Sequence, residues 1–344
     1  MSCGYLVISQ RINKIWMAYT SVEICAGAGG QALGLEMAGF DHLALVEYEK
    51  DYCDCLKRNR PQWNVKCMDV RQFDGKPYCG QVDLLAGGVP CPPFSVAGKQ
   101  LGADDERDLF PQMLRLVEEI NPKVVMIENV RGFLGKQFDL YRGSIIARLN
   151  RLGYNVHLRL LNASDYGVPQ LRPRAIIIGV RTDIYDMFTF PEPKPMLLKD
   201  VGNSLFDLMS ANGWRGAELW KQKANKTAPT LVGGSKKHGG PDLGPTRARQ
   251  AWAEMGIDGR GVADEAPSAG FEGMPRLTPR MMARLQGFPD DWEFGSRKTT
   301  ACRMIGNAFP PPVAKEVGLR VKQVLDYASI DSRSETKIPC RAVG

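Results

Sequence analysis

Short apolar segments alternate with helical segments along the first half of the chain, and this order limits the folds open to it. Segments with strand character are 21–25, 42–46, 82–86 and 124–127, and segments with helical character are 31–38, 50–58 and 109–120. Such alternation is typical of a parallel sheet with helices on both faces. Ligands of these sheets bind at the carboxyl ends of the strands. We therefore predict an α/β, Rossmann-like domain with a mostly parallel sheet and with its functional residues where strands end.

Composition excludes several classes of protein. The 344 residues are 44% hydrophobic and 24% charged, which is ordinary for a folded protein with a large core. Nine cysteines and three histidines show no metal-ligand or disulfide spacing, so we expect a reduced, cytoplasmic protein. No run approaches the roughly 20 apolar residues that a membrane span needs. The net charge of +7 favours a polyanionic partner only weakly.

The alternation is lost between Arg181 and Met274, where Gly, Pro, Lys and Trp are frequent. This region is expected to form a smaller, loop-rich module. The segment from Trp214 to Arg260 contains nine basic residues and four acidic ones. That excess suits contact with phosphates, although a solvated basic surface would look the same. Beyond it, a helix is expected from Pro310 to about Tyr327, with a frayed tail from Ser329.

Two strand ends have the features of an adenosine site. The first strand runs into Ala26-Gly27-Ala28-Gly29-Gly30 and then a helix, so the backbone can approach a ligand closely. The second ends in Glu47-Tyr48, a carboxylate for ribose hydroxyls beside a ring for adenine, and Asp69 could accept from the adenine amino group. Glu47 and Asp69 could equally serve as helix caps or turn residues.

A cysteine held between prolines follows the strand 82–86. The sequence Pro90-Cys91-Pro92 restricts the backbone on both sides of the thiol, which aims Cys91 as a nucleophile. The next strand ends in Glu128, which we place opposite Cys91 across a cleft. Apolar surroundings favour the neutral form of a carboxyl group, so Glu128 could donate a proton.

Alternate residues Gln170, Arg172 and Arg174 share one face of an extended segment. Singly they would be ordinary surface residues. Together with Cys91 and Glu128 they could bind an electron-poor ring.

In these residues the chain resembles the bacterial-type DNA (cytosine-5)-methyltransferases. The similarity extends from Ser21 to Val321 and includes, in family order, Ala26-Gly27-Ala28-Gly29-Gly30, Gly88-Val89-Pro90-Cys91, Glu128-Asn129-Val130, Gln170-Leu171-Arg172-Pro173-Arg174, Arg276-Leu277-Thr278-Pro279-Arg280 with Arg284-Leu285-Gln286-Gly287-Phe288-Pro289, and Ile305-Gly306-Asn307-Ala308. The resemblance implies five regions. They are an extension (1–18), a catalytic and cofactor-binding domain (19–180), a target-recognition domain (181–275), a return to the catalytic domain (276–328) and a tail (329–344).

The resemblance also implies S-adenosylmethionine as cofactor and a role for each matching residue. The catalytic residues would be Cys91, Glu128 and Arg174, with Arg172 in support. The cofactor residues would be Cys25, Ala26, Gly27, Gly29, Gly30, Glu47, Tyr48, Asp69, Val70, Gly88 and Asn307. DNA contacts would come from Ser95, Gln170, Thr230, Leu231, Lys236 and Lys237. No metal is expected.

The chemistry implied is attack of the Cys91 thiolate on C6 of a cytosine, assisted by Glu128 at N3, so that C5 can accept the methyl group. C6 is inaccessible in a stacked duplex, so the base must be rotated out. The loop 95–107, with Gly98 and Gly102 as hinges, is expected to close over the base, unless it is an ordinary surface loop.

Three positions depart from the family pattern. Cys25 replaces an aromatic residue beside the cofactor, which transfers more of the adenine stacking to Tyr48. Val89 and Pro92 replace a Pro and a Gln and change the stiffness of the loop rather than its reactivity. Met17 is a second candidate start, so residues 1–16 would be either an extension or a start-site artefact.

The expected partner is double-stranded DNA, with a cognate restriction endonuclease acting separately, and we expect a monomer in the cytoplasm, associated with the nucleoid. The alternatives are a solitary DNA methyltransferase, a tRNA cytosine-5 methyltransferase and a non-catalytic DNA-binding relative. The sequence does not specify the recognised bases, because readout depends on which side chains reach the major groove.

Overall fold

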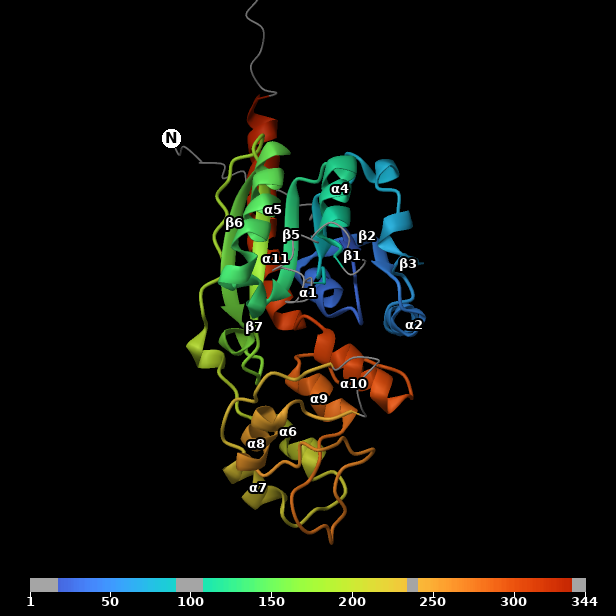
Figure 1. Cartoon of the computed structure of the whole chain (residues 1–344), viewed down its shortest axis with the longest axis vertical. Helices are drawn as coiled ribbons and strands as arrows, with labels where there is room; N and C mark the ends of the chain where they lie inside the picture. The colour runs from blue at the N-terminus through green and yellow to red at the C-terminus, as the bar shows by residue number, and fades with distance from the viewer. Residues whose placement is uncertain (1–17, 91–107, 234–240, 336–344) are drawn as a thin grey trace, which may run out of the picture.

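A single seven-stranded sheet dominates one lobe of the protein, here called the sheet lobe (Figure 1). The computed structural model describes residues 18–90, 108–233 and 241–335. Its strands are β1 (Tyr19–Ile24), β2 (Phe40–Glu47), β3 (Val65–Cys67), β4 (Leu84–Gly87), β5 (Val124–Val130), β6 (Tyr154–Asn162) and β7 (Pro173–Arg181). The predicted strands are confirmed, with ends displaced by a few residues.

In the sheet order β3-β2-β1-β4-β5-β7-β6, the order of the strands reverses between β1 and β4. Strand β7 is antiparallel to both of its neighbours, and the other pairs are parallel, so the predicted mostly parallel sheet is confirmed. Ligands of open α/β sheets bind where the order reverses, outside the carboxyl ends of the strands. The site is therefore expected above β1 and β4.

Helices cover both faces of the sheet. The helices of the described residues are α1 (Gly30–Ala38), α2 (Lys50–Asn59), α4 (Phe110–Ile120), α5 (Asp139–Arg151), α6 (Val201–Met209), α7 (Ala217–Lys223), α8 (Thr246–Glu254), α9 (Pro279–Leu285), α10 (Lys298–Asn307) and α11 (Pro311–Glu335). Helices α1 and α11 pack together on one face, and α4 and α5 cover the other (Figure 1). None of the described helices is long and apolar enough to cross a membrane.

Helices α1 and α11 approach so closely that a glycine is required between them. A Cβ added at Gly34 would lie 2.4 Å from both the Pro311 carbonyl oxygen and the Ala314 Cβ. Such distances are well below van der Waals contact, so any side chain at this position would push α11 away from the sheet. Gly34 thus sets the position of α11 and of the segment that leads into it.

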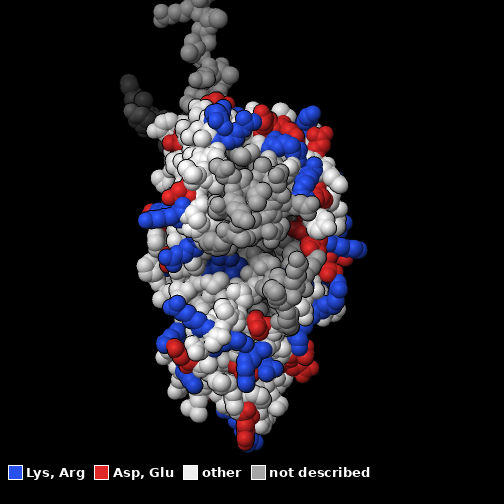
Figure 2. Space-filling model, in the orientation of Figure 1, with Lys and Arg blue, Asp and Glu red and all other residues white. Residues whose placement is uncertain are grey.

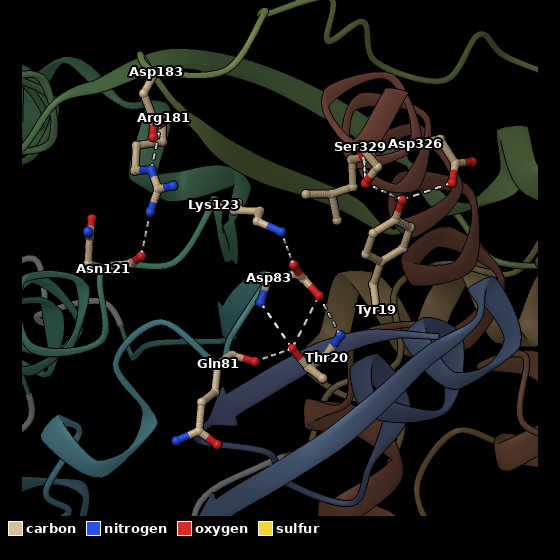
Figure 3. Close-up of polar contacts among 11 residues, drawn as sticks. Tyr19, Thr20, Gln81, Asp83, Asn121, Lys123, Arg181, Asp183, Asp326 and Ser329 are labelled. Atoms are coloured by element: carbon tan, nitrogen blue, oxygen red, sulfur yellow. Dashed lines mark hydrogen bonds and ion pairs between the residues drawn. The ribbon is translucent and has the colours of Figure 1, made fainter. Parts of the chain in front are cut away.

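Helix α11 is longer than predicted. It continues to Glu335, so the expectation of a frayed tail beginning at Ser329 is wrong for this stretch. The physical reason is a contact with the first strand: the Tyr19 hydroxyl donates to Asp326 at 2.9 Å and lies 3.4 Å from the Ser329 hydroxyl (Figure 3). These contacts anchor the turn of helix beyond Tyr327.

A polar network closes the amino-terminal edge of the sheet. Asp83 accepts from the Thr20 amide at 2.9 Å and from Lys123 at 2.7 Å, which joins the starts of β1, β4 and β5 (Figure 3). The groups at the amino-terminal edge of these strands are therefore used in contacts within the protein. We expect the functional site at the opposite edge, where the same strands end.

The second lobe, here called the helical lobe, contains α6 to α10 (Figure 1). These helices share one apolar core, which includes Trp220, Trp252 and Met282. Phe188 and Phe190 instead pack into the core of the sheet lobe. The predicted limits of the target-recognition domain therefore stay a prediction, while the packing places the crossing between lobes after Phe190 rather than at Arg181.

Candidate functional site

The turn after β1 is built from left-handed backbone. Gly27 and Gly29 have φ values of 57° and 86°, which glycine adopts without strain, but Cys25 also has a positive φ of 53°. A non-glycine residue in this conformation is uncommon and costs energy, so the surrounding contacts must hold it. Burial raises the pKa of the Cys25 thiol, and the Glu47 carboxyl group adds to the rise. Cys25 is consequently a neutral wall residue and not a nucleophile.

Glu47, at the end of β2, stabilises this turn by a hydrogen bond to its backbone. Its Oε2 accepts from the Gly27 amide at 2.7 Å and its Oε1 accepts from the Glu49 amide at 2.8 Å. Burial raises the pKa of Glu47, and the backbone amides oppose part of that rise. Each carboxylate oxygen keeps a free lone pair after these bonds. Glu47 can therefore accept two further hydrogen bonds, as from the paired hydroxyls of a ribose.

A cavity of about 230 Å³ lies against this turn. Its described walls are formed by Glu23, Cys25, Ala26, Gly27, Ala28, Gly30, Gln31, Glu47, Tyr52, Gly88, Pro90, Glu128, Met304, Asn307, Ala308 and Phe309. The predicted cofactor residues Cys25, Ala26, Gly27, Gly30, Glu47, Gly88 and Asn307 are thus brought together. They come from both ends of the chain, because α10 ends beside the start of α1.

Four predicted cofactor residues, Gly29, Tyr48, Asp69 and Val70, do not line this cavity. Tyr48 is 68% exposed, and Val70 is buried in the core. Asp69 caps a short 3₁₀ helix by accepting from the Arg71 amide at 2.9 Å, and it also pairs with the Arg71 guanidinium at 2.8 Å. The capping alternative thus describes Asp69 here, and its contact with adenine stays a prediction.

Glu128, which lines the cavity, forms an ion pair with Arg174. The Arg174 Nε lies 2.7 Å from Glu128 Oε1, and both side chains are largely buried. Burial raises the pKa of Glu128 while the Arg174 and Arg172 guanidinium groups oppose the rise. The carboxyl group is therefore fixed in position and surrounded by donors.

The pairing of β4 with β5 brings the segment before Cys91 to Glu128. Gly87 is in register with Ile127, and a Cβ added at the next residue, Gly88, would lie 3.2 Å from Glu128 Oε2. The predicted nucleophile Cys91 and the predicted DNA contact Ser95 lie outside the described residues, as does the loop 95–107. The last described residue before them, Pro90, lines the cavity.

Arg172 is a buried structural junction, and its predicted support of Arg174 in catalysis stays a prediction. Its side chain is 1% exposed and donates to the carbonyl oxygens of Leu231 at 2.8 Å, Gly306 at 2.6 Å and Ala308 at 3.0 Å. These carbonyls belong to segments far apart in sequence. Arg172 therefore joins them behind Arg174.

Gln170 and Leu231 were predicted to contact DNA, and this stays a prediction that their burial in the structure does not favour. Both are buried, and Gln170 donates to Gln286 at 2.7 Å and accepts from the Leu231 amide at 2.9 Å. We call Gln170, Arg172 and Gln286 the polar junction. The Gln170 side chain and the backbone of Leu231 take part in these contacts, and neither residue's side chain is exposed.

Of the remaining predicted DNA contacts, Thr230 lies within the described residues and two lysines do not. Thr230 is partly exposed and donates to the Leu171 carbonyl at 2.5 Å. Lys236 and Lys237 lie outside the described residues. Figure 2 shows Lys and Arg side chains in and around the hollow between the lobes and over the helical lobe. This distribution suits a polyanion that enters between the lobes.

A larger hollow of about 560 Å³ lies elsewhere and includes Pro169, Lys199, Arg284 and Pro312 in its lining. Its arginine, Arg284, is already paired with Asp207 at 2.5 Å and with Asp290. The smaller cavity, which contains the convergent carboxyl groups, is therefore the stronger candidate for the reactive site.

Sequence reasoning missed Glu23 and Gln31, which line the cavity, and Gln286 of the polar junction. Glu23 had a visible signal, since it is an acidic residue inside the apolar strand Ser21-Val22-Glu23-Ile24. Gln31 and Gln286 had none, because their roles depend on contacts between distant segments.

Comparison with known proteins agrees with this geometry. Residues 19–323 match the family model for C-5 cytosine-specific DNA methylase. Type II methyltransferase M.NgoMIV of Neisseria gonorrhoeae is 53% identical over 312 residues, which cover 90% of this chain and 99% of that protein. Type II methyltransferase M.NaeI of Lentzea aerocolonigenes is 52% identical over 311 residues, 89% of this chain and 75% of that protein.

Solved structures share the fold at much lower identity. A mutant of Spodoptera frugiperda DNMT2 aligns with a TM-score of 0.64 at 18% identity, over 88% of this chain and 99% of that one. S. pombe Dnmt2 methyltransferase aligns with a TM-score of 0.60 at 17% identity, over 90% of this chain and 98% of that one. These similarities establish the α/β fold alone.

Proposed function

Since the chain belongs to the C-5 cytosine-specific DNA methylase family, we propose that it methylates a cytosine rotated out of a short, specific DNA sequence, with S-adenosylmethionine as donor. Methylation of DNA cytosine at C5 follows from membership of the family. The donor, the rotated base and a covalent bond from Cys91 to C6 are the proposal. We also propose that it acts as the modification enzyme beside a separate endonuclease.

The observation that carries the proposal is that one cavity contains both Glu47 and Glu128. Glu47 has acceptors for a ribose, and Glu128 lies beside the segment leading to Cys91. A nucleoside cofactor and a target base could therefore meet at one point. Such convergence is what direct transfer between two bound molecules requires.

The cavity walls fit an adenosine bearing an amino acid. The left-handed turn at Gly27 presents backbone to the ligand, Glu47 presents acceptors, and Glu23 and Gln31 add unpartnered polar atoms. When bound, S-adenosylmethionine would supply an electrophilic methyl group on its sulfonium. The residues of the chain must then make C5 of cytosine nucleophilic.

Cys91 performs that activation in our proposal. Its thiolate adds to C6, which places the electron pair of the C5–C6 bond on C5. After C5 has taken the methyl group, the C5 proton leaves and the Cys91–C6 bond breaks. This elimination restores the aromatic ring and the thiolate, so no oxidant or reductant is needed.

Glu128 and Arg174 hold the ring in this proposal. Glu128 donates to N3 while Cys91 adds, which withdraws electron density from C6. Arg174, which lies 2.7 Å from Glu128, donates to the same base in this proposal. The rise in the pKa of Glu128 caused by burial favours the protonated form that this step uses.

The test is transfer of tritiated methyl groups from S-adenosylmethionine to duplex DNA and, separately, to tRNA. We expect label in duplex DNA, recovered as 5-methylcytosine. Cys91→Ala should abolish transfer while binding of DNA is retained. Transfer confined to tRNA, or persistence of transfer in Cys91→Ala, would contradict the proposal.

A further inference from the structure

One carboxylate in the helical lobe holds two exposed arginines. The Asp258 side chain is buried and accepts from Arg260 Nε at 2.8 Å, from Arg260 Nη2 at 3.2 Å and from Arg276 Nε at 3.0 Å. The side chain of Arg260 is 74% exposed and that of Arg276 is 47% exposed. Two guanidinium groups are thus fixed on one carboxylate while both reach the surface.

Folding alone does not explain the side chain of Arg260. Without it, Asp258 would still accept from Arg276 and from the backbone amide of Arg260, which lies at 3.1 Å. The hydrogen bond from the Arg260 guanidinium holds the pKa of Asp258 well below its usual range, so the carboxylate is charged and orients the arginine. Exposed ion pairs contribute little to stability. A guanidinium that is both fixed and exposed is explained better by a ligand.

Contacts of the neighbouring backbone place Arg260 near the link between the lobes. The Gly259 carbonyl, one residue before Arg260, accepts from the Leu243 amide at 3.0 Å. The residue after Leu243 is Gly244, where an added Cβ would lie 3.1 Å from Val232 Cγ2. The chain at Arg260 therefore packs, through the segment 243–244, onto the segment that contains Val232.

That segment lies against the cavity wall. A Cβ added at Gly306 would lie 2.5 Å from the Val232 carbonyl carbon and 2.4 Å from the Gly233 amide nitrogen. Asn307, the residue after Gly306, lines the cavity in which we propose the target base. Figure 2 shows further Lys and Arg side chains over the helical lobe and around the hollow. A short series of packed segments therefore connects Arg260 to the site of the target base.

The donors left on Arg260 match the edge of a guanine. Asp258 uses the Nε hydrogen and one Nη2 hydrogen, so both Nη1 hydrogens and the second Nη2 hydrogen remain. Two of these point in parallel, and such a pair donates to O6 and N7 of guanine, which the major groove exposes. A phosphate would also accept from them, but the Asp258 carboxylate repels an anion, whereas a base edge carries no net charge.

We propose that Arg260 reads a guanine in the major groove of the recognised sequence, with Asp258 and Arg276 as positioning residues. The carboxylate holds the guanidinium in one orientation, so less side-chain entropy is lost when it meets the base. The inference rests on the proposed function for the presence of duplex DNA. It adds a specificity-determining residue and the base that this residue selects.

The experiment methylates a pool of duplexes of randomised sequence and locates the product by bisulfite sequencing. Arg260→Lys keeps the charge but loses the parallel donors. We expect discrimination at one guanine position to fall by about 5- to 150-fold, with the preferences at other positions unchanged. Arg181→Lys is the matched control and should keep the wild-type preferences. Arg181 also pairs with an aspartate two residues away, Asp183 at 2.7 Å, but at the amino-terminal edge of the sheet (Figure 3).

A second measurement needs no variant. 7-Deazaguanine lacks N7 but still pairs with cytosine, so at the position that Arg260 reads it should slow the wild type and leave Arg260→Lys little changed. The guanine contact would be overturned if 7-deazaguanine slowed the wild type at no position, or slowed both proteins equally at every position. It would also be overturned if Arg260→Lys lost rate equally on all sequences, as a phosphate contact or a structural role predicts, or kept every preference. If the wild type methylated no DNA, the proposed function would fail first and the guanine contact with it.

Discussion

At the scale of single residues, the site depends on carboxyl groups with different partners. Glu47 is held by backbone amides, Glu128 by Arg174, and Glu23 by neither. The same functional group, a carboxyl, therefore has a different environment in each of the three residues. In the proposed function, Glu47 would bind ribose hydroxyls and Glu128 would donate to the base, whereas Glu23 has no cation beside it among the described residues that line the cavity.

Substitution of Glu128 tests its task. Glu128→Gln keeps the size of the side chain but removes the acidic proton and the ion pair with Arg174. We expect the turnover rate to fall by about 10²- to 10⁴-fold, the usual contribution of general acid catalysis, with DNA affinity nearly unchanged. Steady-state kinetics and DNA titration measure the two effects. Glu118→Gln, on the exposed pair with Arg148, is the control, and equal losses of turnover and affinity in Glu128→Gln would indicate a structural role.

The raised pKa of Glu23 also predicts a dependence of stability on pH. The folded protein retains the Glu23 proton at pH values where the unfolded chain, with a pKa of about 4.3, has lost it. The free energy of unfolding therefore falls as pH rises above that value. We expect the ligand-free Glu23→Gln variant to lose less stability than the wild type between about pH 5 and about pH 8. Denaturant titrations at several pH values measure this, and parallel curves for the two proteins would contradict it.

At the scale of elements, the close packing of α1 against α11 positions the site. Helix α1 carries Gln31 on its first turn, and α11 follows directly from Ala308 and Phe309 in the cavity wall. A Cβ at Gly30 would lie 2.1 Å from the Phe309 carbonyl oxygen, so this segment touches the backbone of α1. Displacing either helix would open the cavity.

Gly34→Ala tests this packing. The added methyl group meets backbone and cannot be accommodated by rotation of a side chain, so we expect a loss of about 1–3 kcal/mol in the free energy of unfolding. Gly143→Ala on α5 is the matched control. Nothing lies within 4 Å of its added Cβ, and a gain of about 0.5–1 kcal/mol is expected for a helix interior. Equal stability of the two variants would contradict the close approach of α1 and α11.

At the scale of the whole molecule, the polar junction joins the lobes. Gln170 bonds to the Leu285 carbonyl at a separation of 115 residues, and Arg172 bonds to the Ala308 carbonyl at a separation of 136. Buried bonds between such distant segments fix how the helical lobe faces the sheet lobe. These bonds therefore connect the two sides of the hollow between the lobes (Figure 2).

Loss of the Arg172 guanidinium should disturb both lobes together. Arg172→Ala leaves three buried carbonyl groups without their donor, at about 1–3 kcal/mol each when no water replaces it. We expect a lower melting temperature together with weaker DNA binding. Thermal unfolding and DNA titration measure the two effects. An unchanged melting temperature would show that the junction is dispensable.

The fold and the core of the site could be predicted from sequence because both depend on local patterns. Strand periodicity placed Glu47 at the end of a strand and Glu128 within three residues of one, and the glycines after β1 marked the turn. The buried roles of Gln170 and Arg172 could not be predicted, since alternation along a strand says nothing about which distant carbonyl a side chain meets. The direction of Glu23 toward the cavity is likewise set by the packing of α1 on the sheet.

The most direct test of the central claim is the mass of the complex formed with duplex DNA containing 5-fluorocytosine in the recognised sequence. Fluorine cannot leave as a proton does, so the final elimination is blocked and the bond between Cys91 and C6 persists. We expect an adduct of protein and DNA that requires S-adenosylmethionine, maps to Cys91 and is absent in Cys91→Ala. Turnover on ordinary cytosine with no such adduct, or an adduct at another residue, would contradict the mechanism.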